Sequence, residues 1–133
     1  MRILITGALG WTAKAIVDVL STHKHVLVGL DLADAQVYSA LDSFDAIVHA
    51  GIEDYDTVWR IVEGIDAIVH LAVAIDSGYE TPTIPFDVNV RGTANLFQAA
   101  VDHQVKRVIL LSSAPFHVEN QQQIHAIEDR LQG

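Results

Sequence analysis

The sequence predicts an α/β domain, a doubly wound parallel sheet with strand order 3-2-1-4-5, and three observations support this fold class. Short apolar runs alternate with helical patterns along the chain, as expected for a sheet built from βαβ units. Each run is apolar at consecutive positions rather than at alternate ones, which is typical of strands covered by helices on both faces. A glycine-rich turn follows the first run directly. In this fold class, ligands bind at the carboxyl ends of the strands.

The periodicity predicts five strands with helices between them. Strands are expected at Arg2–Thr6, Val26–Asp31, Ala46–His49, Ala67–Ala72 and Arg107–Ser112. Helices are expected at Thr12–Ser21, Ala33–Leu41, Tyr55–Val62 and Val88–His103, the last with an apolar stripe of Val88, Leu96, Ala99 and Ala100. A loop over 114–120 and a short helix over 121–131 follow.

Composition limits the classes of function. The chain has 133 residues, which suits one domain with a sizeable core, and half of them are hydrophobic. It has no cysteine, which excludes disulfides and thiolate chemistry and fits a cytoplasmic location. The net charge of −9 with scattered lysines and arginines argues against nucleic acid. We also expect no membrane span, because no apolar run approaches about 20 residues, and no metal site.

The strongest single motif is the turn Thr6–Ala13, which links the first strand to the first helix. Gly7 permits a tight turn, and Gly10 leaves room for the backbone to approach a pyrophosphate. Ala13 is small enough for the helix and strand to pack closely. The amides of Leu9–Thr12 are expected to point toward the phosphates of a dinucleotide. The alternative is an ordinary turn between a strand and a helix.

Asp31 ends the second expected strand, 21 residues after Gly10. A carboxylate near this spacing accepts hydrogen bonds from the adenosine ribose hydroxyls and repels a 2′-phosphate. No Arg or Lys occurs between Val26 and Ser43 to receive such a phosphate. The sequence therefore favours NAD over NADP as the cofactor. The alternative is that Asp31 caps the helix that follows it.

With these motifs the sequence resembles the extended short-chain dehydrogenases/reductases, the NAD-dependent epimerase/dehydratase family. The likeness covers about residues 1–118 and is carried by four segments in order, Thr6–Ala13, His70–Val73, Asn89–Leu96 and Leu110–Ala114. It implies a Rossmann-type NAD-binding domain over 1–118, truncated after the fifth strand. Residues 119–133 would form a helical tail, with no substrate domain. Relatives transfer hydride between a sugar and NAD, so the resemblance implies a nucleotide sugar as substrate.

The resemblance also implies a set of cofactor contacts. The pyrophosphate would be contacted by Gly7, Gly10, Trp11 and Thr12, and the adenosine ribose by Asp31. The adenine would lie against Gly51 and Ile52. The central cofactor channel would be lined by Leu71, Ala72 and Val73, with Asn89 nearby. Where Gly51 stands, the family usually has an Asp that receives the adenine amino group. Adenine recognition is then either looser here or uses Glu53. For Asn89, the alternative role is to tie together the backbone of adjacent elements.

The catalytic residues that the resemblance implies are incomplete. Ser113 matches the family's serine that hydrogen-bonds the substrate, although a turn or capping role suits it equally. The family's acid/base Tyr, followed four residues later by Lys, is absent: none of the three tyrosines has Lys at that spacing, and all precede Ser113. We therefore expect an NAD-binding domain that is not catalytically complete alone. The alternative function is a non-catalytic NAD-binding, sensing or interaction module. Three explanations of the missing pair remain open: a truncated relative, a natural short protein, or one part of a split enzyme.

The fifth expected strand, Arg107–Ser112, becomes an edge of the sheet in a domain of this length. It is apolar, and its unpaired backbone groups would be a template for pairing. We expect this edge to be covered either by a second copy of the chain or by the segment 119–131.

Overall fold

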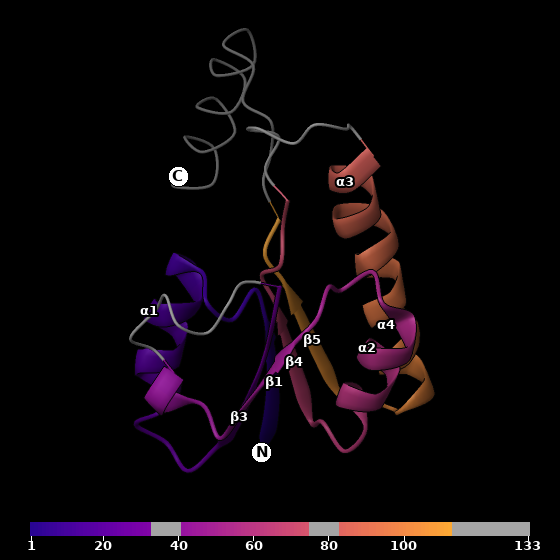
Figure 1. Cartoon of the computed structure of the whole chain (residues 1–133). Coiled ribbons are helices and arrows are strands. Elements are labelled where there is room, and N and C mark those ends of the chain that lie inside the picture. The colour runs from indigo at the N-terminus through magenta and orange to yellow at the C-terminus, as the bar shows by residue number, and fades with distance from the viewer. Residues whose placement is uncertain (33–40, 75–82, 113–133) are drawn as a thin grey trace, which may run out of the picture.

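In the computed structural model, which describes residues 1–32, 41–74 and 83–112, five parallel strands form one sheet in the order β3-β2-β1-β4-β5. This confirms the expected fold class and strand order. The strands are β1 (Arg2–Thr6), β2 (Val26–Asp31), β3 (Ala46–His49), β4 (Ala67–His70) and β5 (Arg107–Leu110). The chain winds outward in one direction from β1 to β3 and in the other from β4 to β5, so β1 and β4 flank the switch point (Figure 1).

Two strands end earlier than the sequence predicts. β4 ends at His70, the register partner of Thr6, because β1 ends at Thr6 and no further β1 residue remains to pair with. The next amide, Leu71 N–H, lies 3.1 Å from the Thr6 carbonyl oxygen and 3.2 Å from Thr6 Oγ1. β5 ends at Leu110, the register partner of His70, because no further β4 residue remains to pair with. The boundaries of the other three strands are as expected.

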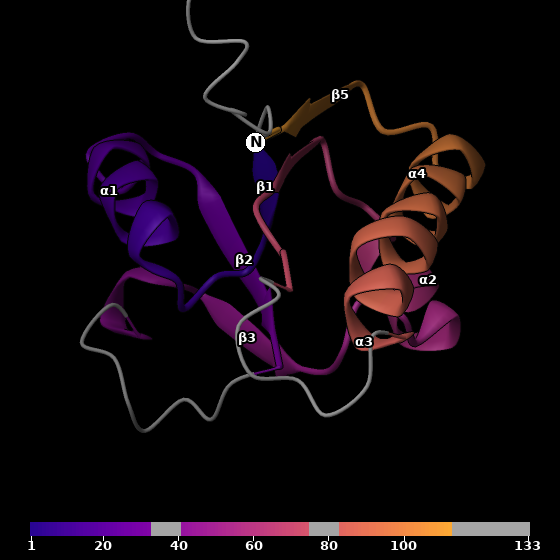
Figure 2. The same ribbon diagram turned by 90° about the horizontal axis from the view of Figure 1, so that it is seen from above.

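The helices divide between the two faces of the sheet. α1 (Trp11–Leu20) covers one face, and α2 (Tyr55–Val62) and α4 (Thr93–Asp102) cover the other (Figures 1 and 2). In the described ranges, no helix has both the length and the apolar character needed to cross a membrane.

The last expected helix, Val88–His103, begins earlier than predicted. Helical structure starts at α3 (Thr83–Phe86) and continues through η3 (Asp87–Gly92), a π-helical segment, into α4. Pro85 is compatible with this start because the first turn of a helix needs no N–H donor. The helix expected over 33–41 lies outside the described residues except for Leu41, which belongs to the short 3-10 turn η2 (Leu41–Ser43). The expected loop, tail and domain boundary after Ser112 lie outside them as well.

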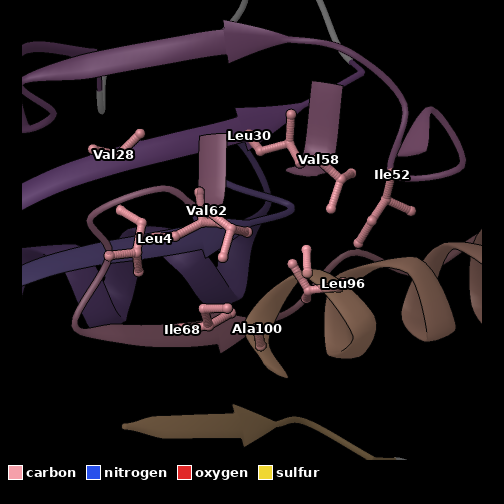
Figure 3. Packing of buried hydrophobic residues seen from close by; sticks show 11 residues of the cluster. Leu4, Val28, Leu30, Ile52, Val58, Val62, Ile68, Leu96 and Ala100 are labelled. Atoms are coloured by element: carbon pink, nitrogen blue, oxygen red, sulfur yellow. The ribbon is translucent and has the colours of Figure 1, made fainter. Parts of the chain in front are cut away.

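Apolar side chains of β1 to β4 alternate between the two faces of the sheet and form two cores. On one face Leu4, Val28, Leu30 and Ile68 pack with residues of α2 and α4, including Val58, Val62, Leu96 and Ala100 (Figure 3). On the other face Ile3, Ile5, Leu27 and Val69 pack with Ala13 and Val17 of α1, together with Ala8 and Phe44. Because both faces of these four strands are covered, they are apolar at consecutive positions, as the sequence indicated.

Candidate functional site

A cleft of about 680 Å³ opens at the carboxyl ends of the strands. Its volume lies within the range of roughly 300–1,000 Å³ that is usual for small-molecule and cofactor sites. All the expected cofactor contacts except Asn89 line it: Gly7, Leu9, Gly10, Trp11, Thr12, Asp31, Gly51, Ile52, Leu71, Ala72 and Val73. Tertiary structure thus brings together segments that lie far apart in the sequence.

The glycine-rich turn packs against the end of β2 and against the segment that follows β4. Gly7 has φ +67°, and a Cβ at this position would lie 2.8 Å from the backbone nitrogen of Ala72. The amides of Gly7 and Ala8 both donate to the Leu30 carbonyl oxygen, at 2.9 and 3.3 Å. Glycine is therefore needed at position 7 for its backbone conformation and for the close approach of the chain after β4.

The backbone N–H groups at the start of α1 lack hydrogen-bond acceptors among the described residues. Gly10 is the N-cap and offers no side-chain acceptor, and the first turn carries no acidic residue. The first helical hydrogen bond runs from Lys14 N–H to the Gly10 carbonyl oxygen. Within the part of the chain that the structure describes, the amides of Trp11, Thr12 and Ala13 meet no acceptor. These amides and the helix dipole make this helix end suitable for an anion such as a pyrophosphate.

Asp31 lies directly beside this turn. Its Oδ2 accepts a hydrogen bond from the backbone N–H of Leu9 at 2.8 Å. The Leu9 amide therefore differs from the expectation: it is held by Asp31 instead of pointing toward the phosphates. An ionised carboxylate accepts several hydrogen bonds at once, so this contact is compatible with ribose binding. The alternative, in which Asp31 caps a following helix, concerns residues outside the described ranges.

A buried polar network joins the turn to β4 and α4. Thr6 Oγ1 accepts hydrogen bonds from the amides of Leu71 and Ala72, each at 3.2 Å. Its own proton is then donated to His70 Nδ1, 2.6 Å away. In the neutral tautomer whose Nδ1 accepts this bond, His70 carries its proton on Nε2, which donates to Thr93 Oγ1 at 2.9 Å. Burial lowers the pKa of His70, which favours this neutral form.

The network of Thr6, His70 and Thr93 was not predicted from the sequence. Thr6 and His70 are the two polar residues in the otherwise apolar ends of β1 and β4, and they are register partners. That polar pair is the signal that could have revealed the network, although only the strand register brings the two side chains together.

Asn89 is the one expected cofactor contact that does not line the cleft. Asn89 Oδ1 accepts from Ala74 N–H, and Asn89 Nδ2 donates to the Ala74 carbonyl oxygen, both at 2.8 Å. This pair of hydrogen bonds ties η3 to the segment after β4, which is the alternative role considered for Asn89. Ser113, the expected catalytic residue, lies outside the described residues.

Comparison with known proteins finds dehydrogenases and epimerases among the relatives of this chain. The chain is 34% identical over 113 residues to a uronate dehydrogenase of Pseudomonas syringae pv. tomato, an alignment that covers 84% of this chain and 39% of that protein. The chain therefore spans about two fifths of the length of this curated relative.

Solved structures agree with this relationship. A UDP-glucose-4-epimerase from Stenotrophomonas maltophila with bound NAD and formylated UDP-arabinopyranose has a TM-score of 0.74 and 27% identity, over 86% of this chain and 37% of that one. A short-chain dehydrogenase/reductase superfamily protein from Agrobacterium tumefaciens with bound NAD has a TM-score of 0.73 and 28% identity, over 85% and 33%.

The match to a family model extends along nearly the whole chain. The model of the NAD-dependent epimerase/dehydratase family matches residues 3–131. This agrees with the four motifs seen in the sequence and with the strand order of the sheet. The chain belongs to the NAD-dependent epimerase/dehydratase family and comprises its NAD-binding domain.

Proposed function

We propose that this chain binds NAD in the cleft, with the pyrophosphate on the first-turn amides of α1 and the adenosine ribose on Asp31. The observation that carries the proposal is the proximity of an uncapped helix start to a carboxylate, joined through Leu9 N–H at 2.8 Å. A helix end supplies donors for phosphate without any basic side chain. The net charge of −9 is therefore no obstacle to dinucleotide binding.

NAD is the preferred cofactor and NADP the disfavoured one. A 2′-phosphate on the ribose would lie against the Asp31 carboxylate, and like charges repel. The sequence from Val26 to Ser43 holds no Arg or Lys that could neutralise it. Isothermal titration with NAD, NADH and NADP tests both proposals. No heat of binding at millimolar NAD would overturn the assignment, and equal affinity for NADP would overturn the selectivity.

By itself the chain binds the cofactor without turning over a sugar. Leu71, Ala72 and Val73 border the cleft where the nicotinamide half would extend, and family membership makes a nucleotide sugar the expected substrate class. Oxidation of a sugar hydroxyl requires a group that accepts its proton, and the 133 residues hold no Tyr followed four residues later by Lys. The alternative function is a non-catalytic NAD-binding or sensing module.

Hydride transfer separates these functions. NAD and candidate nucleotide sugars are incubated with the chain, and NADH is followed by its absorbance. We expect binding of NAD without formation of NADH. Formation of NADH at a rate proportional to protein concentration would show that the chain is catalytically complete.

We also propose that the outer edge of β5 is covered, either by a second copy of this chain or by its segment 119–131. In the described part of the chain β5 pairs only with β4, and Ile109 and Leu111 are 60% and 58% exposed. Such an apolar edge favours pairing. Light scattering should report a dimer if a second copy covers the edge. A monomer whose segment 119–131 is cleaved rapidly by protease would exclude both covers.

A further inference from the structure

β3 places a histidine beside the carboxylate of the proposed ribose site. In the described part of the chain, β3 forms one edge of the sheet and runs beside β2 (Figure 2). The two strands pair in register, with Gly29 opposite Ile47 and Asp31 opposite His49. Asp31 and His49 are the last residues of their strands. Because neighbouring strands lie about 4.8 Å apart, these two residues are neighbours at the carboxyl end of the sheet.

Their side chains project from the same face of the sheet. Leu27 and Ile47 both pack in the core beneath α1. Side chains alternate along a strand, so Asp31 and His49 lie on this face as well. The preceding register pair shows how closely such neighbours approach, since a Cβ at Gly29 would lie 3.2 Å from Ile47 Cγ1. The carboxylate of Asp31 therefore has the imidazole of His49 as its neighbour on β3.

His49 is the one residue of this region that can carry a positive charge. The sequence from Val26 to Trp59 contains no Lys, no Arg and no other His. This region includes Asp31 and the cleft-lining residues that follow β2 and β3. Histidine ordinarily changes its charge between pH 5 and pH 8. The charge next to the proposed ribose site is therefore set by the pH.

The other charged groups around this histidine are mostly acidic. β2 contributes Asp31, the turn η2 before β3 carries Asp42, and the turn after β3 carries Glu53. On α1, which covers the same face, Lys14 and Asp18 pair with each other at 2.7 Å. A positive charge on the histidine would therefore change the local potential from repelling an anion toward attracting one.

His49 lies at the outer side of the cleft. Its side chain is exposed. Asp31, Leu32 and Ala50 line the cleft, whereas His49 does not. NADP differs from NAD by a phosphate on the 2′ oxygen of the adenosine ribose. Such a phosphate would extend beyond a ribose that is bound at Asp31, toward the side on which His49 lies.

We propose that His49 decides how strongly the cleft rejects NADP. A neutral His49 leaves the 2′-phosphate against the Asp31 carboxylate, and NAD is preferred. A protonated His49 donates a charge-assisted hydrogen bond to the phosphate and offsets the carboxylate. The preference for NAD therefore decreases as the pH falls. This inference rests on the proposed binding of NAD in the same cleft and adds a pH-dependent selectivity to it.

The first test measures the affinities for NAD and NADP by calorimetry at pH 8 and at pH 5.5. A phosphate group itself gains a proton in this interval, so the wild type is compared with His49→Asn, whose side chain stays neutral. The ratio of NAD to NADP affinity should fall roughly tenfold further in the wild type than in His49→Asn, the effect of a hydrogen bond to a charged group. His23→Asn, which changes an exposed histidine before β2, should behave as the wild type. Circular dichroism checks that each protein is folded at both pH values.

The second test supplies the charge permanently. In His49→Arg the ratio of NAD to NADP affinity at pH 8 should be roughly tenfold lower than in the wild type. His23→Arg adds the same charge near the amino ends of the strands, and it should keep the wild-type ratio. This pair of variants separates a local contact from the effect of net charge.

The outcomes distinguish this inference from the function on which it rests. His49→Asn protein with the wild-type change between the two pH values would overturn the role of His49 while NAD binding stands. His49→Arg protein with the wild-type ratio, or without detectable binding of NADP, would do the same. Wild-type protein that binds neither dinucleotide at either pH would overturn the proposed function itself.

Discussion

Thr6 Oγ1 lies 2.6 Å from His70 Nδ1, at the buried register pair where β1 and β4 end side by side. The same oxygen accepts the amides of Leu71 and Ala72. One hydroxyl group thus joins the strand end before the glycine turn to Leu71 and Ala72, which line the cleft. These hydrogen bonds hold two segments that are far apart in the sequence side by side at the candidate cofactor site.

The protonation of His70 should make stability depend on pH. Burial lowers the pKa of His70 in the folded chain, whereas the unfolded chain titrates near the ordinary value of about 6.5. Below that pH the unfolded state binds more protons than the folded state, so the free energy of unfolding should fall as the pH decreases from about 6.5. Urea denaturation between pH 7 and pH 5 measures this decline.

Histidine substitutions test whether His70 causes this decline in the free energy of unfolding. In His70→Asn the decline over this pH interval should be smaller than in the wild type. His23→Asn, which changes an exposed histidine, should retain the wild-type decline. A His70→Asn chain with the same pH dependence as the wild type would contradict the buried neutral imidazole.

Gly7→Ala should be more destabilising than Gly64→Ala, although both glycines have positive φ, +67° and +73°. A Cβ at Gly64 meets nothing within 4 Å, so that variant reports only the backbone strain, about 1–2 kcal/mol. At Gly7 the Cβ also collides with the backbone of Ala72, and overpacking adds about 1–3 kcal/mol. Urea denaturation of the two variants measures the difference, and equal losses would show that the collision relaxes freely.

Asp31→Ala should weaken NAD binding by about 1.5–3 kcal/mol, the effect of losing charge-assisted hydrogen bonds. It should also reduce the discrimination against NADP, because the repulsive carboxylate is gone. Asp42→Ala, an exposed carboxylate that does not line the cleft, is the matched control. Calorimetry with both dinucleotides measures the change, and an unchanged affinity for NAD would leave Asp31 with a structural role alone.

Trp11 should report cofactor binding by fluorescence. Its side chain is 88% exposed and lines the cleft, so a bound dinucleotide would displace water from the indole. The chain has two tryptophans. The other one, Trp59 on α2, lies against the ring of His103 and does not line this cleft. Trp59→Phe should retain an emission change on titration with NAD, whereas Trp11→Phe should lose it. A response that persists in Trp11→Phe would contradict this placement.

Much of the fold was readable from local patterns. The boundaries of β1, β2, β3 and α2 were predicted correctly, because apolar runs and helical periodicity are properties of consecutive residues. The ends of β4 and β5 were wrong by two residues each, since a strand stops where its neighbour stops pairing. The start of the last helix was also wrong, because a proline in the first turn looks like an interruption when read from sequence alone.

The sequence predicted which residues line the candidate site but not the hydrogen bonds among them. The residues that line the cleft follow from motif positions, since ligands in this fold class bind where the strands end. The hydrogen bond from Leu9 to Asp31 and the pairing of Thr6 with His70 did not follow from any motif.

The sequence by itself determined the fold class, the strand order and the family, because βαβ units and the glycine turn are encoded in short stretches of chain. Only the tertiary structure decided which donor meets which acceptor at the cleft. Those partners come from segments tens of residues apart, and their distance depends on strand register and on how closely glycine lets the backbones approach.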